Sequence, residues 1–268
     1  MVTLLDYTPS PELLIALSAK LCYTPSTPEK IVENYIKDLE KRINKLTPHC
    51  QLPLTVEKID NSIKLEIPKT CKIECEDDPE ITSFINMLFS MGHLTPFEHT
   101  TYNFLITCSR TTSHQLVRHR VASFSQKSQR HVSESNMRFV TPPSLINNTK
   151  YNECIKIVQD TYNKLCENVS QEAARYILPN ACETHLVVSM NCRELYHFFN
   201  LRCCNRAEWE IRNVAKEMLY ILRFVSPILF NRAGPTCFIS GSCPEKKMTC
   251  SKINEVKQEF SELKINEE

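Results

Sequence analysis

Glycine is unusually scarce in this chain, and the scarcity limits what the chain can fold into. Only Gly92, Gly234 and Gly241 occur among its 268 residues. Glycine-rich phosphate-binding loops need several glycines at fixed spacing, because backbone amides reach a phosphate closely only where side chains are missing. Neither the G-x-G-x-x-G pattern nor the G-x-x-x-x-G-K-S/T pattern occurs in the sequence. The chain therefore has neither a Rossmann fingerprint nor a P-loop, and side chains must hold any nucleotide that it binds.

The rest of the composition is that of an ordinary globular protein. Hydrophobic residues make up 42% of the chain, charged residues make up 24%, and the net charge is +1. A chain of this length can bury a substantial core in one large domain. No apolar run approaches the roughly 20 residues that cross a bilayer, and residues 1–6 lack the basic and apolar regions of a signal peptide. We therefore expect a cytoplasmic protein without a membrane partner.

The spacing of apolar residues predicts a single α+β domain with a mixed or antiparallel sheet flanked by helices. Ser10-Pro11 and Thr27-Pro28 each indicate a helix start, since proline fits the first turn of a helix. Alternating apolar residues within 52–76 predict an antiparallel hairpin or a three-strand meander. The other predicted elements are helices near 79–91, 113–120, 150–168, 171–178, 192–201 and 207–224, strands near 100–108, 137–140 and 184–189, a serine-rich loop after 120, and a tail from 245 that is either a frayed helix or disordered.

Positive charge is concentrated between residues 110 and 138. The single acid of this segment, Glu134, faces six cations: Arg110, Arg118, Arg120, Lys127, Arg130 and Arg138. Closely spaced cations repel one another unless water or an anion screens them, so a solvated basic face and an anion-binding site are both open. The mixture of Arg with Ser and Gln favours binding of a phosphate and a heterocycle, because the planar guanidinium fork suits both.

Two other functions for this segment are less well supported. A nucleic-acid-binding protein would need a broader basic surface with interleaved aromatic residues, and the near-neutral chain offers neither. Ser128 lacks the glycine elbow that aims a nucleophilic serine, so phosphate contact by Ser128 and Arg130 is favoured. Gln115, Arg118 and Arg120 cannot share one helical face, which implies that they meet different ligands or subunits.

Fourteen cysteines occur, without the features of an exported disulfide scaffold. We expect most of them to be reduced core residues. The best set of candidate metal ligands is Cys237, Cys243 and Cys250, together with the Cys203-Cys204 pair. Its spacing lacks the C-x2-C knuckle of structural zinc sites, so the sequence favours packed thiols over a metal.

Three further clusters combine residues that carry chemistry. Residues 92–99, with Gly, Pro and two His, form either a structured turn or a ligand-binding connection. Glu172 and Arg175 fit an exposed helical ion pair. Arg193 and His197 are four residues apart and share a helical face, which is either a solvated surface or a binding surface.

In their order along the chain, these segments resemble the flavin-dependent thymidylate synthases, the ThyX family. The family signature of Arg-His-Arg, seven residues and Ser is similar to Arg118-His119-Arg120 followed by Ser128. Flanking motifs also match: Gly-His-x-x-Pro-x-Glu-His ending at His99, Ser-Arg-x-x-Ser-His-Gln before the signature, and Asn-Leu-Arg-Cys-Cys-x-x-Ala-x-Trp-Glu-Ile around Arg202. The resemblance covers residues 79–250.

The resemblance implies a methyltransferase that reductively methylates dUMP to dTMP. Methylene-tetrahydrofolate gives the carbon, and NADPH reduces the FAD cofactor that delivers hydride. The family is a homotetramer with sites between subunits, and no nucleic acid, metal or protein nucleophile is implied. The resemblance further implies a catalytic domain at 1–250, an inserted hairpin or meander at 45–76, and a charged tail at 251–268.

Residue roles are carried over by position. The resemblance assigns FAD contacts to His99, Thr101, Arg118, His119, Arg120, Asn191, Arg193 and His197. It assigns dUMP contacts to Gln115, Gln126, Ser128, Arg130, Arg175 and Arg202. Arg202 is the catalytic candidate, since its charge beside the uracil ring would stabilise negative charge developing there. The sequence departs from the usual family residues at Gln126, His197, Arg206 and Glu208. A folded relative without catalysis remains an alternative on the sequence alone.

Overall fold

The computed structural model describes residues 1–45, 54–59, 62–66 and 78–262. Its centre is a six-stranded sheet in the order β3-β2-β1-β4-β6-β5. The strands are β1 (Val2–Tyr7), β2 (Leu54–Ile59), β3 (Ser62–Glu66), β4 (Thr101–Ser109), β5 (Ala122–Gln126) and β6 (Glu183–Asn191). All neighbouring strands run antiparallel. The predicted α+β class with an antiparallel sheet is confirmed.

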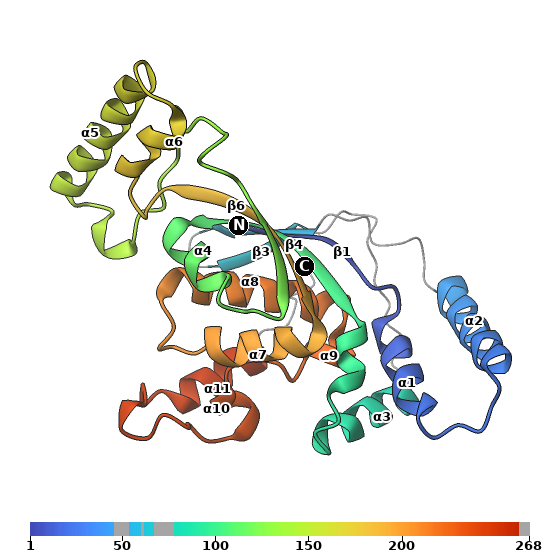
Figure 1. Cartoon of the computed structure of the whole chain (residues 1–268). Helices are drawn as coiled ribbons and strands as arrows, with labels where there is room; N and C mark the ends of the chain where they lie inside the picture. Colours follow the sequence, from blue (N-terminus) through green and yellow to red (C-terminus); the bar gives the residue numbers. More distant parts are fainter. Residues whose placement is uncertain (46–53, 60–61, 67–77, 263–268) are drawn as a thin grey trace.

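Helices cover one face of the sheet, and one helical arm projects from it (Figure 1). The helices of the main body are α1 (Pro11–Leu21), α2 (Pro28–Lys45), α3 (Pro79–Ser90), α4 (Arg110–Leu116), α7 (Cys192–Arg202), α8 (Trp209–Val225), α9 (Pro227–Phe230), α10 (Thr236–Ser240) and α11 (Ile253–Glu262). The arm contains α5 (Thr149–Cys166) and α6 (Gln171–Ala174), and it leads into β6. Short 3-10 turns are η1 (Thr95–His99), η2 (Pro143–Leu145), η3 (Arg175–Ile177) and η4 (Lys246–Met248). Among the helices of the described residues, none has the length and hydropathy that a membrane crossing requires.

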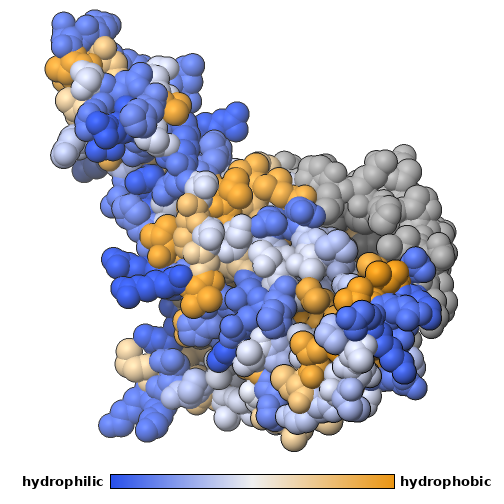
Figure 2. Space-filling model, turned by 45° about the vertical axis from the view of Figure 1, so that its right-hand side comes forward, coloured by the Kyte–Doolittle hydropathy of each residue, from blue (hydrophilic) through white to orange (hydrophobic). Residues whose placement is uncertain are grey.

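The two faces of the sheet are buried unequally, because its strands alternate apolar and polar residues. Tyr102, Phe104 and Ile106 of β4 are fully buried, whereas the residues between them are partly exposed. The buried face packs on α7 and α8 in one hydrophobic core. The other face remains accessible, and Val187 of β6 is 39% exposed on it. Figure 2 shows hydrophobic side chains gathered beside the base of the α5–α6 arm.

Helix α3 begins and ends where the sequence predicts. Asp78 caps it, since its carboxylate accepts hydrogen bonds from the backbone N–H groups of Glu80 and Ile81, both at 3.1 Å. Gly92 follows the helix with φ 72, the left-handed conformation that glycine adopts without strain. The predicted strand near 100–108 follows after η1 as β4. This connection places residues 92–99 at the end of the sheet.

Two predictions for the basic segment were wrong. Helix α4 begins at Arg110 and not at Ser113, because Ser109 is the cap and its Oγ accepts from Thr112 N at 3.1 Å. The serine-rich stretch after residue 120 is not only loop. Residues 122–126 form β5, whose alternating exposure lets small polar side chains face solvent while the backbone pairs with β6.

The predicted hairpin within 52–76 is present in the structure, whereas the strand predicted near 137–140 is not. The hairpin expected within 52–76 is present as β2 and β3, and β2 pairs with β1 and so extends the main sheet. A third strand at 71–75 lies outside the described residues. The strand predicted near 137–140 is reduced to a single bridge between Phe139 and Cys182, and Pro142 and Pro143, two and three residues after Val140, prevent its extension.

The tail after residue 245 is more ordered than predicted. Helix α11 buries Val256 and Phe260 against the main core. Arg223 of α8 donates from Nη1 to the carbonyl of Phe260 over 2.6 Å. Gly234 makes room for the rings of Phe238 and Phe260, since an added Cβ there would lie 2.9 Å from Cδ1 of Phe238 and 3.2 Å from Cδ1 of Phe260. The sequence left a frayed helix and disorder both open for this tail, because a helix with only two inward-facing apolar residues has a weak sequence signal.

Candidate active site

Helix α7 carries four of the predicted site residues between its cap and its last turn. Asn191 caps the helix, and its Oδ1 accepts from the backbone N–H of Glu194 at 2.8 Å. Arg193 and His197 are both exposed, as expected for one helical face. Arg202 ends the helix and is partly buried. The predicted Asn191 cap is confirmed.

One end of the β4–β6 ladder brings further predicted flavin contacts to this helix. Thr101 pairs with Asn191 across the ladder. His99 ends η1, two residues before Thr101, and is exposed. Glu98, also in η1, hydrogen-bonds to Arg193 of α7. His99, Thr101, Asn191 and Arg193 therefore gather at one end of the sheet.

Two hydrogen bonds hold His119, the centre of the Arg-His-Arg segment, between Glu194 and Arg202. Glu194 Oε1 lies 3.0 Å from His119 Nδ1, and Arg202 Nε donates to His119 Nε2 over 3.1 Å. Because a guanidinium can only donate, Nε2 must accept, so the ring proton is on Nδ1 and faces the carboxylate. His119 and Glu194 are only 4% and 8% exposed. Arg202 Nη2 also reaches the carbonyl of Gln115 at 3.5 Å, so this chain of contacts fixes the guanidinium.

The surroundings keep the His119 ring neutral. Burial is the largest cause that lowers the pKa of His119 below 6.5, the charge of Arg202 acts in the same direction, and the hydrogen bond to Glu194 opposes both. His119, Glu194 and His197 also bring three possible metal-ligand atoms within 4.8 Å of one another. A metal there would have to replace either the hydrogen bond of His119 to Glu194 or the one to Arg202, and it would meet the positive charge of Arg202. The arrangement therefore suits a fixed arginine better than a metal.

Arg118 and Arg120 are arranged differently from the histidine between them. Both are exposed at the turn from α4 to β5, while His119 faces inward. Exposed and buried side chains therefore alternate along the segment, and the arginines and the histidine can have different roles. The arginines are free to meet an anionic ligand from solvent, whereas His119 acts within the protein.

Glu210 joins two of the sequence motifs through buried hydrogen bonds. Its carboxylate accepts from the backbone N–H of Ser109 at 2.7 Å and from the hydroxyl of Thr112 at 2.7 Å, and it also hydrogen-bonds to the Ser109 hydroxyl. Glu210 is 8% exposed. These bonds join the start of α4 to the start of α8. The Ser-Arg-x-x-Ser-His-Gln and Trp-Glu-Ile motifs therefore build one buried polar contact.

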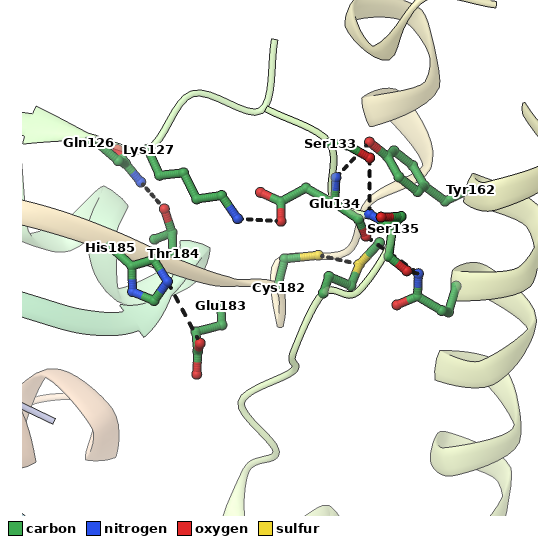
Figure 3. Close-up of polar contacts among 12 residues, drawn as sticks. Gln126, Lys127, Ser133, Glu134, Ser135, Tyr162, Cys182, Glu183, Thr184 and His185 are labelled. Carbon is green, nitrogen blue, oxygen red and sulfur yellow. Dashed lines mark hydrogen bonds and ion pairs between the residues drawn. The ribbon is translucent and has the colours of Figure 1, made fainter. Parts of the chain in front are cut away.

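The predicted phosphate-binding loop follows β5 and is closed by an ion pair (Figure 3). Lys127 Nζ lies 2.7 Å from Oε2 of the buried Glu134, and the backbone N–H of Glu134 donates to Tyr162 Oη at 3.1 Å. The loop between Lys127 and Glu134 carries Ser128 and Arg130. Its two ends are thus tied together and to helix α5.

Gln126 connects this loop to α4. Its Nε2 donates to Ser113 Oγ at 3.0 Å and to Thr184 Oγ1 at 3.2 Å (Figure 3 shows the contact with Thr184). Ser113 lies two residues before Gln115, whose carbonyl contacts Arg202. The predicted dUMP contacts Gln115 and Gln126 are therefore linked to Arg202 through α4.

The arm contributes the remaining predicted dUMP residues. Arg130 Nε pairs with Glu172 of α6 at 3.2 Å, and both side chains are about half exposed. The expected pair between Glu172 and Arg175 is therefore replaced by one with Arg130. Arg175 begins η3, is partly buried and lies over the ring of Tyr176. An exposed pair of this kind contributes little stability, so a phosphate can compete for Arg130.

Two departures from the family pattern have clear local roles. Glu208 caps α8, accepting from the backbone N–H groups of Glu210 at 3.0 Å and Ile211 at 3.2 Å. Arg206 donates from Nη1 to the carbonyl of Met248 at 2.8 Å. Both residues therefore stabilise the segment after Arg202.

Sequence reasoning missed Glu194 and Glu210. Both are carboxylates on helices, where exposed acids are common, and nothing in the spacing marks them as buried. Glu194 sits one turn before Phe198 in a helix with few apolar residues on its outer face. The only usable signal was the position of each acid inside a motif that otherwise carries arginine and histidine.

Comparison with known proteins agrees with these motifs. The family model described as thymidylate synthase complementing protein matches residues 3–228. The flavin-dependent thymidylate synthase of Clostridium tetani is 38% identical over 96% of this chain and 95% of its own length. The enzyme of the same name from Geobacter sulfurreducens is 38% identical over 98% of this chain and 99% of its own. That from Sulfolobus acidocaldarius is 45% identical over 60% of this chain and 65% of its own. The chain therefore belongs to the flavin-dependent thymidylate synthases, the family and enzyme class that its motifs predict.

Proposed function

We propose that this protein methylates dUMP reductively to dTMP, with methylene-tetrahydrofolate as carbon donor and NADPH as the source of electrons for bound FAD. The observation that carries the proposal is the fixed Arg202, which Glu194 and His119 hold at the end of α7. A guanidinium held in this way is pre-organised to meet charge that develops on a substrate ring. Family membership gives the reaction class.

The residues proposed to bind FAD fit an anionic dinucleotide. Arg118, Arg120 and Arg193 are exposed cations, and a dinucleotide carries two phosphates that arginine binds well. His99 and His197 are exposed and add hydrogen-bonding groups. These side chains replace the backbone amides of a glycine-rich loop, which the chain lacks. A bound flavin, once reduced, would supply the hydride.

The loop between Lys127 and Glu134 fits the phosphate and sugar of dUMP. Ser128 and Arg130 offer a hydroxyl and a guanidinium, and Arg175 adds a second cation from η3. Within the described residues, Gln129 Nε2 is buried without a hydrogen-bond partner. A buried donor without an acceptor is costly, so a ligand atom would satisfy it.

The proposed reaction needs no protein nucleophile. Cys203, next to Arg202, is fully buried, and burial raises the pKa of its thiol. A thiol of this kind is rarely ionised at neutral pH and is a poor nucleophile. Arg202 would instead orient the uracil ring and stabilise negative charge on its carbonyl oxygen.

We further propose a cytoplasmic homotetramer with its active sites between subunits. The exposed sheet face, including Val187, and the outward-facing Arg118 and Arg120 support surfaces that another subunit covers. The eleven cysteines of the described residues are all free, which suits a reducing compartment. Nucleic acid is a poorer partner, because the whole chain carries a net charge of only +1.

Two variants test the proposal. Arg202→Ala should keep its bound flavin but lose most dTMP formation, by about 100-fold or more, because donors of this type contribute several kcal/mol to a transition state. Arg118→Ala should instead retain less flavin after purification, which its visible spectrum measures. Unchanged dTMP formation by Arg202→Ala would remove the role of this arginine.

A further inference from the structure

Arg130, which the proposed function assigns to the phosphate of dUMP, already pairs with a carboxylate of the same chain. Its Nε lies 3.2 Å from Oε1 of Glu172, and the two side chains are 55% and 51% exposed. Carboxylates and phosphates both bind the planar fork of N–H donors that arginine presents. Glu172 and the phosphate of a nucleotide therefore need the same donors of Arg130.

A second arginine that we assign to dUMP lies one turn beyond Glu172. Glu172 belongs to α6, and Arg175 begins η3 directly after that helix. Residues three apart on a helical turn are neighbours, so Glu172 and Arg175 share one face of this turn. The Arg175 guanidinium lies over the ring of Tyr176, 5.9 Å from its centroid, a contact that leaves its charge unneutralised. Glu172 therefore brings one negative charge to a place that has two cations.

The remaining cation of the loop is less available to a ligand than Arg130. Lys127 Nζ lies 2.7 Å from Oε2 of Glu134, which is only 3% exposed. Loss of this lysine contact would leave a buried carboxylate without a counter-charge, which is strongly destabilising. The exposed pair of Arg130 with Glu172 has no such cost, so Arg130 is the cation that can change its partner.

The loop also has a hydroxyl that is ready to meet an anion. The backbone N–H of Arg130 donates to Ser128 Oγ at 3.2 Å. Because the hydroxyl oxygen accepts this bond, its own proton is left for a ligand oxygen. Ser128 and Arg130 can therefore bind one phosphate together once the guanidinium leaves Glu172.

The pair between Arg130 and Glu172 can open without detaching the loop from the arm. The backbone N–H of Glu134 donates to Tyr162 Oη at 3.1 Å, and Gln159 Nε2 donates to the carbonyl of Ser135 at 2.9 Å (Figure 3 shows Glu134, Ser135 and Tyr162). Both acceptor and donor groups of α5 stay in place when Arg130 moves. The exchange of partners is therefore a local movement of two exposed side chains.

We propose that Glu172 is an internal competitor of the nucleotide phosphate, and that Arg130 exchanges Glu172 for the phosphate when dUMP binds. The inference rests on the proposed function, since it takes Arg130 as a phosphate ligand. A phosphate monoester carries a charge of about −1.5 to −2 at pH 7, so it attracts Arg130 and Arg175 more strongly than a carboxylate does. Singly charged anions gain little by replacing Glu172. The competitor thus lowers the affinity for dUMP and keeps weaker anions from Arg130.

The affinity of FAD-loaded protein for dUMP tests this exchange, measured by titration calorimetry in a buffer without phosphate. Glu172→Gln should bind dUMP about two- to five-fold more tightly than wild type, because an exposed pair contributes free energy of that order. Glu153→Gln, at an exposed acid of α5, makes the same change of charge in the arm and should leave the affinity unchanged. The direction is decisive, since loss of a residue that only held the loop in shape would weaken binding.

A double-mutant cycle separates the exchange from a general effect of charge. In an Arg130→Gln background, Glu172→Gln should no longer tighten dUMP binding, because the guanidinium for which the two anions compete is missing. Deoxyuridine, which lacks the phosphate, should have the same inhibition constant against dUMP in wild type and in Glu172→Gln. An equal gain in both backgrounds, or an equal gain for deoxyuridine, would overturn the inference.

The same titrations distinguish this inference from the proposed function. Wild-type protein that binds dUMP, with equal or weaker binding by Glu172→Gln, would overturn the competitor role and leave the proposed function standing. Wild-type protein that binds no dUMP would overturn both.

Discussion

Glu194 and His119 show how two buried side chains can set the position of a third. Neither needs to touch a ligand: the carboxylate fixes the histidine tautomer, and Nε2 of the ring then accepts from Arg202. Sequence reasoning identified His119 and Arg202 as site residues but not their contact. The reason is that 83 positions separate them, and only the tertiary fold brings the end of α7 beside the residues that follow α4.

Glu194→Gln should lower kcat/KM for dUMP by about ten-fold or more, which corresponds to about 1.4 kcal/mol of lost transition-state stabilisation. A glutamine amide can donate to Nδ1 and so place the ring proton on Nε2, where it faces the Arg202 guanidinium. Steady-state kinetics with the flavin content measured in parallel would check this. Glu80→Gln, at an exposed acid of α3, is the control. An unchanged kcat/KM in Glu194→Gln would show that the carboxylate does not position Arg202.

The lowered pKa of His119 predicts a dependence of stability on pH. The folded state binds this proton less readily than the unfolded chain, whose histidine titrates near 6.5. Stability should therefore be full above 6.5 and fall as the pH drops from 6.5 toward the folded-state pKa. Urea unfolding of wild type and His119→Gln between pH 7.5 and 5.5 would measure the difference. Equal slopes in the two proteins would contradict a neutral, buried His119.

At the scale of elements, the sequence predicted those with strong local signals. Helices α3 and α7 have a polar cap followed by apolar residues, and both begin as expected. Strand β5 was missed because only Ala122 and Phe124 supply apolar alternation, which is too short a pattern, and its pairing with β6 is decided by tertiary structure. The arm could be predicted as helices, but its projection from the sheet could not.

The contact between Tyr162 and the loop after β5 can be tested directly. Tyr162→Phe removes the acceptor of the Glu134 N–H, and an unsatisfied buried donor costs about 1–3 kcal/mol. The loosened loop should raise KM for dUMP more than KM for NADPH. Tyr151→Phe in the same helix is the control, because that hydroxyl has no hydrogen-bond partner among the described residues. If both variants raise KM for dUMP equally, the loop does not depend on this bond.

Helix α11 should contribute to the stability of the whole domain. Phe260 is 1% exposed and lies 5.8 Å from the ring of Phe238. Phe260→Ala should lower the free energy of unfolding by about 3–5 kcal/mol, the usual cost of such a cavity. Glu255→Ala, in an exposed pair with Lys252, should change it by less than about 0.5 kcal/mol. Equal urea midpoints for Phe260→Ala and wild type would mean that α11 is not part of the folded core.

For the whole molecule, the scarcity of glycine fits a site whose ligand-binding groups are side chains. The chain lacks phosphate-binding glycine loops. It has exposed arginines at the end of its sheet, and the ion pair of Lys127 with Glu134 closes a loop beside the α5–α6 arm. The sequence motifs predicted the family and the α+β class. They could not predict which residues lie together within one chain, because residues far apart in the sequence, such as His119 and Arg202, meet only through tertiary packing. The proposed homotetramer predicts a particle mass near four times the 31.1 kDa chain.

The most direct test of the central claim is an anaerobic reaction of the purified protein with dUMP, methylene-tetrahydrofolate and NADPH, with dTMP measured by chromatography and the flavin spectrum followed throughout. We expect an oxidised-flavin spectrum that bleaches on addition of NADPH, followed by dTMP that forms only when all three substrates are present. Protein that is loaded with FAD and bleached by NADPH, yet forms no dTMP, would contradict the proposed function.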